Sequence, residues 1–219
     1  TLLAEVPSFA VEEAIGRLYE NIIGRSEAFI SLIFPKIKEL FPEQFENVTA
    51  HDFYLAVNKA EPSLIRTEAD ELTYSMHIMV RYEIEKRLMD GSLSTKDLPN
   101  EWNRLYKEYL GIDVPCDSMG CLQDSHWSGG ALGYFPSYSL GSAYGAQFLH
   151  KMKQDIDIDK LVSENRIDEV TAWLTEKIHK YGMLLTPAQL IENACGEEFN
   201  ADYYIEYLTE KYNKIYDLK

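Results

Sequence analysis

The sequence predicts an all-α, predominantly helical fold, and two observations carry this prediction. In several long segments the apolar residues recur every three or four positions, which is the spacing of one face of an α-helix. Prolines, glycines and capping residues stand where those segments would begin or end. The chain has 219 residues, of which 46% are hydrophobic, so it can bury a large core as one domain or as one lobe of a domain.

In the first half of the chain, helices are expected over residues 11–34, 35–40, 49–59, 67–89 and 99–110. Pro35 should interrupt the first of these, because proline lacks the N–H that a helix interior needs. Thr67 and Asp70 have the spacing of a capping box, which predicts that the fourth helix begins there. Gly91 and Gly111 follow the expected ends of the fourth and fifth helices.

In the second half, helices are expected over residues 136–154, 167–181 and 186–195, with a last helix after Asn200. Thr186 and Gln189 have capping-box spacing, and Pro187 suits the first helical position. Residues 112–134 have few helix signals and many turn residues. Long irregular segments inside compact domains tend to be functional, so this region is a candidate for the site.

The helix expected to end near Met89 carries an unusual polar stripe. Its apolar residues spread around most of its circumference, which indicates burial on several sides. Four polar residues nevertheless fall within a sector of about 80°, namely Asp70, Thr73, His77 and Arg81. A polar stripe on a buried helix must be paired or must line a cavity. Two interpretations stay open: a structural network that joins Asp70 to Arg81 around His77, or a stripe that faces a substrate groove.

Charge and cysteine content argue against some partners and compartments. The formal net charge of −15 would repel nucleic acid and anionic membrane surfaces, so neither is expected as a partner. No unbroken apolar run has the length of a membrane span. Three cysteines without a signal peptide fit a reduced compartment, and a cytoplasmic location is expected.

Residues 120–138 combine polar chemistry, aromatic rings and glycines in one stretch of an otherwise helical chain. The polar members are Gln123, Asp124, His126, Tyr134 and Tyr138, which offer hydrogen-bond donors, acceptors and one group that titrates near neutrality. Gly129, Gly130 and Gly133 allow the backbone to approach a ligand closely. We interpret the stretch as the wall of an active site.

The same stretch resembles a known family. Gly-x-x-Gln-Asp-x-His-Trp at residues 120–127, followed by Gly-Tyr-Phe-Pro-Ser-Tyr at 133–138, is similar to the signature of the carboxypeptidase Taq type of metallocarboxypeptidases. The Ile-Arg-Thr-Glu-Ala-Asp element at 65–70 and Arg-Leu-Tyr-Glu-Asn at 17–21 support the resemblance. It implies a helical metallopeptidase fold like that of the thimet-oligopeptidase and zincin group, with a very small sheet in residues 112–134 near the active site.

The resemblance also implies a divalent metal, zinc or cobalt, which the family binds through His-Glu-x-x-His and a later Glu. None of the five histidines here begins such a motif. Residues 1–219 are therefore expected to be a single helical C-terminal region of a longer enzyme, without the part that bears this motif and without a need to bind metal alone. Glu13 aligns with the third metal ligand and Arg17 with an arginine beside it, although the intervening residues differ. The alternative for Glu13 is an exposed charged stripe.

Further site residues are implied position by position. His126 and Tyr138, with Tyr134 as second choice, would donate to the oxyanion or the substrate backbone. Arg66 would bind the terminal carboxylate of a peptide, since a planar guanidinium can form two parallel hydrogen bonds with it. Gln123, Asp124, His77 and Arg81 complete the expected substrate-binding set. The alternatives are an Arg66 that pairs with an acidic neighbour and a His126 that belongs to the core.

The implied activity is hydrolysis of the C-terminal peptide bond of peptides by metal-activated water. The chain alone is expected to be inactive, and its expected partners are the peptide substrate, the missing N-terminal part and a second copy in a homodimer. A second hypothesis is that the chain is a helical peptide-binding or structural module that has lost catalysis. The altered residues around Glu13 favour that hypothesis, and peptide binding without turnover would distinguish it.

Overall fold

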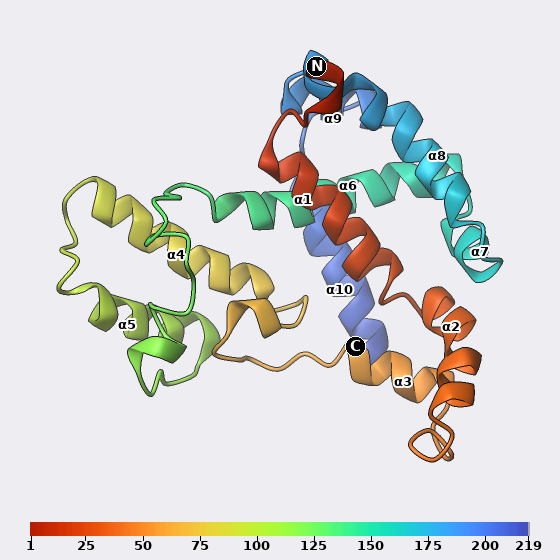
Figure 1. Cartoon of the computed structure of the whole chain (residues 1–219), viewed down its shortest axis with the longest axis horizontal. Coiled ribbons are helices and arrows are strands. Elements are labelled where there is room, and N and C mark those ends of the chain that lie inside the picture. Colours follow the sequence, from red (N-terminus) through yellow and green to blue (C-terminus); the bar gives the residue numbers. More distant parts are fainter. Residues whose placement is uncertain (219) are drawn as a thin grey trace. The chain divides into compact units, whose positions relative to one another are not determined.

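The computed structural model describes residues 1–218, and it confirms the predicted all-α fold (Figure 1). The α-helices are α1 Phe9–Arg17, α2 Glu27–Leu40, α3 Ala50–Val57, α4 Tyr74–Met89, α5 Leu98–Leu110, α6 Pro136–Asp155, α7 Ile158–Ser163, α8 Ile167–Lys177, α9 Pro187–Cys195 and α10 Asp202–Tyr216. Short 3-10 helices occupy Leu2–Ala4, Arg66–Glu68, Asp117–Met119 and His179–Leu184. No strand forms within residues 1–218, so the small sheet expected in residues 112–134 is not present there.

The chain divides into two compact units. Unit 1 consists of Thr1–Asn58 and the segment from Leu140 onward, and unit 2 consists of Lys59–Ser139. Each of the two units has its own hydrophobic core. None of the helices in residues 1–218 combines the length and the apolar character that a membrane crossing requires.

The core of unit 1 is built by α1, α6, α8 and α9. Its fully buried members include Leu18, Phe148, Met152, Leu174 and Leu190. Helices α1 and α6 approach each other closely at Gly141, where an added β-carbon would lie 2.5 Å from the β-carbon of Glu13 and 3.0 Å from the backbone nitrogen of Ala14. Glycine at this position therefore determines where α1, and with it Glu13, lies against α6.

The prediction of one long helix over residues 11–34 is wrong. Helix α1 passes into a π-helical segment, Leu18–Ile23, in which the N–H of Gly24 donates to the carbonyl of Tyr19 at 2.9 Å. The chain then leaves the helix, and α2 begins after Ser26, whose hydroxyl accepts from the N–H of Phe29 at 3.1 Å. Pro35 does not interrupt α2 but lies inside it. Apolar spacing continued across the break because residues on both sides of it pack on the same core.

The helix expected to begin near Thr67 begins instead at Tyr74. Asp70 lies before it, where the backbone N–H of Thr73 donates to Asp70 Oδ1 at 2.9 Å and its hydroxyl donates to Oδ2 at 2.7 Å. Asp70 therefore belongs to a turn and not to the polar stripe of α4. The network that was one interpretation of the stripe, between Asp70 and Arg81, does not form, because Arg81 pairs with Asp124.

In the second half of the chain, α6 and α9 lie where they were predicted. The capping box of Thr186 and Gln189 is present, and Gly196 ends α9 in the left-handed region with a φ of 81°. The helix expected over residues 167–181 ends at Lys177 and is followed by the 3-10 helix His179–Leu184. Helix α7 was not predicted. It begins after Asp157, whose side chain accepts from the N–H of Lys160 at 3.2 Å.

In unit 2, α4 and α5 pack against each other around Val80, Ile84, Trp102 and Leu105. The opposite face of α4 is apolar but exposed: Met76 is 39%, Met79 45% and Tyr82 46% accessible to solvent. Helix α4 is thus apolar on both faces, which explains why its sequence pattern indicated burial on several sides. Within residues 1–218, α4 is buried toward α5 and, at Tyr74 and Ile78, against Phe135.

We expect Gly141→Ala to destabilise unit 1, because the new methyl group would force α1 away from α6. Overpacking of this kind costs about 1–3 kcal/mol. Gly16→Ala in α1 is the matched control, since nothing lies within 4 Å of its added β-carbon; this change should stabilise the helix by up to about 1 kcal/mol. Urea unfolding measures both. Equal effects of the two substitutions would contradict the close approach.

Candidate active site

The carboxylate of Asp124 lies between two guanidinium groups in unit 2. Arg66 donates to Asp124 Oδ1 from Nε at 3.0 Å and from Nη2 at 2.7 Å. Arg81 donates to Oδ2 from Nε at 2.7 Å, and its Nη2 lies 2.5 Å from the same oxygen. The side chains of Arg66, Arg81 and Asp124 are 7%, 0% and 9% exposed. We refer to these three residues as the arginine–aspartate cluster.

The cluster joins three separate parts of unit 2. Arg66 opens the 3-10 helix Arg66–Glu68, Arg81 lies on the buried face of α4, and Asp124 belongs to the irregular segment after Asp117–Met119. Aromatic rings cover the two cations: the guanidinium carbon of Arg81 lies 4.6 Å from the ring centre of Trp102, and that of Arg66 lies 4.8 Å from the ring centre of Tyr138. The flat guanidinium groups suit both the carboxylate and the rings.

The charges of the cluster support one another. Burial raises the pKa of Asp124, but the nearby Arg81 and Arg66 outweigh it and hold that pKa below its ordinary value. Burial lowers the pKa of Arg66, but its hydrogen bond to Asp124 and the neighbouring Tyr74 raise it overall. Asp124 is therefore ionised near neutral pH, and because the guanidinium group of arginine is always charged in proteins, the cluster carries a net charge of +1.

Hydrogen bonds between neutral groups hold the backbone next to Arg66 in place. Gln123 Oε1 accepts from the backbone N–H of Arg66 at 2.8 Å, and Gln123 Nε2 donates to the carbonyl of Leu64 at 3.0 Å. The hydroxyl of Tyr106 donates to the same carbonyl at 3.2 Å and lies 3.1 Å from His77 Nδ1. Gln123 and Tyr106 thus hold the backbone at Leu64 and Arg66, and Tyr106 links it to α5 and, through His77, to α4.

His77 is fully buried, at 0% exposure. Because the Tyr106 hydroxyl already donates to Leu64, it accepts from His77, which places the ring proton on Nδ1. His77 Nε2 is then a buried acceptor without a hydrogen bond in the described chain. Burial, and then the charges of Arg81 and Arg66, lower the pKa of His77 to about 3. His77 and Arg81 lie in the interior, where the described structure gives a peptide no access to them.

His126 and Tyr138, the two residues expected from the resemblance as donors, lie within hydrogen-bond distance of each other. His126 Nε2 lies 3.1 Å from the Tyr138 hydroxyl. The His126 ring lies 4.4 Å from the ring centre of Phe135 and 5.5 Å from that of Tyr134. Burial, and then the charge of Arg66, lower the pKa of His126, so its ring is neutral at pH 7. A neutral His126 offers one N–H donor and one acceptor nitrogen, and the partly exposed Tyr138 adds a hydroxyl.

Glu13 lies in unit 1, on the side of α1 that meets Gly141. Its neighbour Arg17 donates from Nη1 to Glu20 at 3.1 Å. Residues 1–218 contain no group of three or more His, Cys, Asp or Glu side chains that could hold a metal. Since a catalytic zinc uses three protein ligands, the single carboxylate predicted as a ligand does not by itself fit the metal.

Some members of the site had not been singled out in the sequence. Tyr74 accepts from Arg66 Nη1 at 3.0 Å, Tyr106 supports Gln123, and Glu85 accepts from Trp127 Nε1 at 2.7 Å. The one available signal was at Glu85, which is an acidic residue beside Ile84 on a helix that is apolar on both faces. A buried carboxylate on such a helix must have partners.

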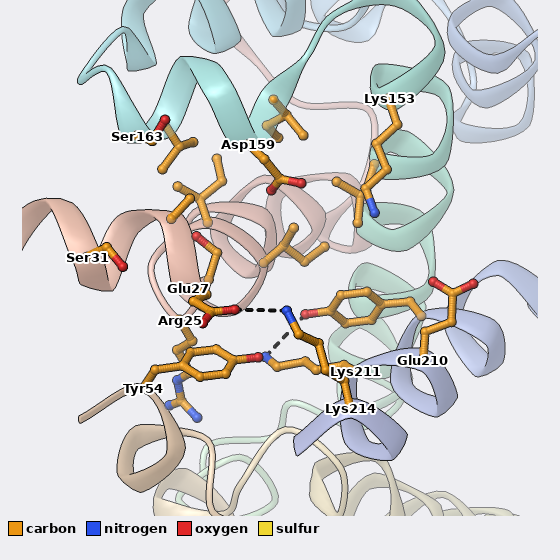
Figure 2. A pocket seen from close by; sticks show the side chains of 18 residues that line it. Arg25, Glu27, Ser31, Tyr54, Lys153, Asp159, Ser163, Glu210, Lys211 and Lys214 are labelled. Atoms are coloured by element: carbon orange, nitrogen blue, oxygen red, sulfur yellow. Dashed lines mark hydrogen bonds and ion pairs between the residues drawn. The ribbon is translucent and has the colours of Figure 1, made fainter. Parts of the chain in front are cut away.

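A pocket in unit 1 does not involve the predicted site residues. It has a volume of about 640 Å³. Figure 2 shows charged side chains of both signs around it, with Lys214 of α10 bound to Glu27 at the start of α2 at 2.8 Å. Arg25, Lys153 and Asp159 also line it. The candidate site is therefore defined by its hydrogen-bonded groups and not by this pocket.

Comparison with known proteins gives matches to metallopeptidases of the carboxypeptidase type. The family model described as carboxypeptidase Taq (M32) metallopeptidase matches residues 1–212. The chain is 45% identical over 217 residues to Carboxypeptidase 1 of Bacillus subtilis (strain 168), which covers 99% of this chain and 43% of that relative. It is 41% identical over 213 residues to Thermostable carboxypeptidase 1 of Pyrococcus furiosus, covering 97% of this chain and 42% of that relative.

The solved structures agree with these matches. The M32 carboxypeptidase from Deinococcus radiodurans R1 superposes with a TM-score of 0.94 at 37% identity, over 98% of this chain and 44% of that one. The chain belongs to the carboxypeptidase Taq (M32) metallopeptidase family. It spans somewhat more than two fifths of the length of the relatives that it matches.

We expect acid to destabilise the fold through His77. An unfolded His77 binds its proton near pH 6.5, whereas the folded one binds it only near pH 3. Between these values the unfolded chain holds more protons, so the free energy of unfolding should fall by up to about 1.4 kcal/mol for each unit of pH lowered. Urea unfolding from pH 6.5 to about 4.5 should show a shallower fall in His77→Phe. Equal slopes in both proteins would refute this account.

We expect Asp124→Asn to destabilise unit 2 by about 3–5 kcal/mol, because it leaves two buried guanidinium groups without their counter-charge. Asp113→Asn is the matched control: Asp113 pairs with Lys107 at 2.8 Å but is 86% exposed. An exposed pair contributes less than about 1 kcal/mol. Chemical denaturation compares the two. A small loss in Asp124→Asn would show that the cluster is not a source of stability.

Proposed function

We propose that the chain is part of a metal-dependent carboxypeptidase that hydrolyses the C-terminal peptide bond of peptides. Membership of the M32 family supports the class of activity. The observation that carries the proposal in this chain is the pair formed by His126 and Tyr138, 3.1 Å apart. Phe135 lies against His126, and Tyr138 also covers the guanidinium of Arg66. A neutral imidazole and a phenol hydroxyl, joined by one hydrogen bond, thus stand beside a positively charged cluster.

In this proposal His126 and Tyr138 stabilise the negative charge that develops on the peptide carbonyl oxygen. Donors that are already oriented need no rearrangement during the reaction, which is why such groups are effective. Phe135 and Tyr134 hold the His126 ring by contact. The lowered pKa of His126 favours the neutral ring, in which one nitrogen carries the N–H that can donate to an oxyanion or a backbone carbonyl and the other is an acceptor.

Arg66 is proposed to bind the terminal carboxylate of the peptide. Asp124 and Tyr74 accept three of its five N–H groups, from Nε, Nη1 and Nη2. The two remaining N–H groups and the net positive charge of the cluster favour a second carboxylate. Gln123, Asp124, Arg81 and His77 would act by holding Arg66 and not by touching the peptide, because their contacts are with Arg66 and with one another.

Metal binding and cellular setting complete the proposal. Glu13 would be one ligand of a zinc or cobalt ion whose other ligands, together with the general base, come from the remaining part of the enzyme. The chain alone would then be inactive. A cytoplasmic location is proposed because Cys116, Cys121 and Cys195 are all free thiols. A homodimer stays part of the proposal through the resemblance alone.

Loss of catalysis is the second candidate function. It is favoured by Glu12, Ala14 and Gly16, which stand beside Glu13 where the family carries other residues. Under this alternative the full-length protein would bind peptides through Arg66 but would not cleave them. Binding of a free-acid dipeptide without turnover, in the presence of zinc or cobalt, would favour it over the proposed activity.

The decisive experiment uses the full-length enzyme that contains this chain. Tyr138→Phe removes one hydroxyl and keeps the ring, so kcat and kcat/KM should fall together by roughly 10²–10³. Tyr134→Phe is the matched control, because its ring also lies against His126 while the hydrogen bond of His126 goes to Tyr138. The control should change both constants by less than about tenfold. If the two variants had the same rates, the role assigned to Tyr138 would be wrong.

A further inference from the structure

Glu85 is a buried carboxylate that the proposed mechanism does not use. It lies on α4 at 5% exposure. One of its oxygens, Oε1, accepts from Trp127 Nε1 at 2.7 Å and from the backbone N–H of Gly133 at 3.1 Å. A carboxylate removed from water must be compensated by such bonds, and here both come from the same loop.

Those two bonds hold the two ends of an exposed loop, residues 128–133. Trp127 directly follows His126, and Gly133 directly precedes Tyr134. Gly133 has a φ of 76°, in the left-handed region, which allows its N–H to turn toward α4. A single oxygen atom of Glu85 therefore binds both the residue that follows His126 and the residue that precedes Tyr134.

The other hydrogen bonds of this loop are internal. Within residues 1–218, the N–H groups of residues 129–132 donate to carbonyls of residues 125–130, and the Ser128 hydroxyl donates to the carbonyl of Ser125. Apart from the adjoining Ser125 and His126, Glu85 is thus the only residue outside residues 127–133 to which they are hydrogen-bonded in the described chain. The remaining anchor is the Trp127 ring, which packs edge-on against Trp102 at 6.0 Å and Phe135 at 5.8 Å.

We infer that Glu85 is a positioning residue that fixes the loop between His126 and Tyr134, and so keeps His126 aligned with Tyr138. This inference rests on the proposed function in so far as it concerns catalysis. The negative charge of Glu85 also acts in the direction that raises the pKa of His126, against the stronger effects of burial and Arg66. The residue therefore influences both the place and the basicity of His126.

The test compares Glu85→Ala with Glu85→Gln. Alanine removes the acceptor, whereas the amide oxygen of glutamine can still accept from Trp127 and Gly133. Glu83→Ala is the matched control, because Glu83 lies on the same helix and pairs with Lys86 at the surface. NMR of the chain measures hydrogen exchange at the Trp127 indole and the Gly133 amide, together with the pH titration of His126.

In Glu85→Ala, exchange at both groups should be roughly ten- to hundredfold faster, because a hydrogen bond to a charged group is lost. Glu85→Gln should restore slow exchange while the pKa of His126 falls, since the acceptor is kept and the charge is removed. In the full-length enzyme, Glu85→Ala should lower kcat by about 10² with little change in KM, because the donors would be misplaced. Glu85→Gln should recover most of that rate, and Glu83→Ala should behave like the unchanged protein.

Unchanged exchange in Glu85→Ala would overturn the inference, whatever the enzyme does. Faster exchange with an unchanged kcat would overturn the catalytic part, while the Tyr138→Phe experiment would still decide the proposed function. If Glu85→Ala does not fold, Trp127→Phe removes one of the two bonds and keeps an aromatic ring. Exchange at Gly133 should then rise and kcat should fall by a smaller factor than in Glu85→Ala, and no change in either would overturn the inference.

Discussion

The carboxylate of Asp124 is bound by two guanidinium groups from separate segments, and the arrangement of unit 2 around the candidate site depends on it. Removing such charges from water costs several kcal/mol for each ion, so the group is stable only when every member is paired. Arg81 has its ion pair with Asp124, a hydrogen bond of 2.7 Å to the carbonyl of His77 and the ring of Trp102. The segment that carries Asp124 is therefore fixed against α4. His126, two residues further along, is placed with it.

The same constraint explains why uncharged groups gather behind Arg66. A guanidinium group forms two parallel hydrogen bonds with a carboxylate only when it is held in one orientation, because both groups are planar. Gln123 holds the backbone of Arg66, and Tyr106 supports Gln123. His77 completes this set but leaves one nitrogen without a partner. An unpaired buried acceptor costs about 1–3 kcal/mol, so this arrangement sacrifices stability for a fixed geometry.

The parts of the fold that were predicted correctly are those set by neighbouring residues. Helices α3 and α9 begin at capping boxes, and α5 and α9 end at glycines in the left-handed region, so local signals sufficed. The break after α1 was missed because apolar spacing reports the core, and the core continues on both sides of the break. At the start of α4, Thr67 and Asp70 have capping-box spacing, yet Asp70 caps Thr73 instead. The choice between these two turns depends on how the following helix packs.

In the candidate site, too, contacts between residues close in sequence could be predicted, whereas those that depend on packing could not. The pairing of His126 with Tyr138 joins residues only 12 positions apart, and the sequence pattern placed them together. The partner of Arg66 is 58 positions away, so the pattern offered the acidic neighbour only as an alternative. Likewise, a helical stripe shows which residues share a face but not which face the core covers, and His77 and Arg81 lie on the covered one. Sequence thus identified most of the groups, whereas packing decided which of them reach solvent.

The exposed face of α4 makes the chain sensitive to oxidants in an unusual way. Two of its apolar side chains, Met76 and Met79, are accessible thioethers, which oxidants convert to polar sulfoxides. Met152, by contrast, is completely enclosed in the core of unit 1. Oxidation of these two thioethers would therefore leave Met152 untouched and turn one apolar helix face into a polar one.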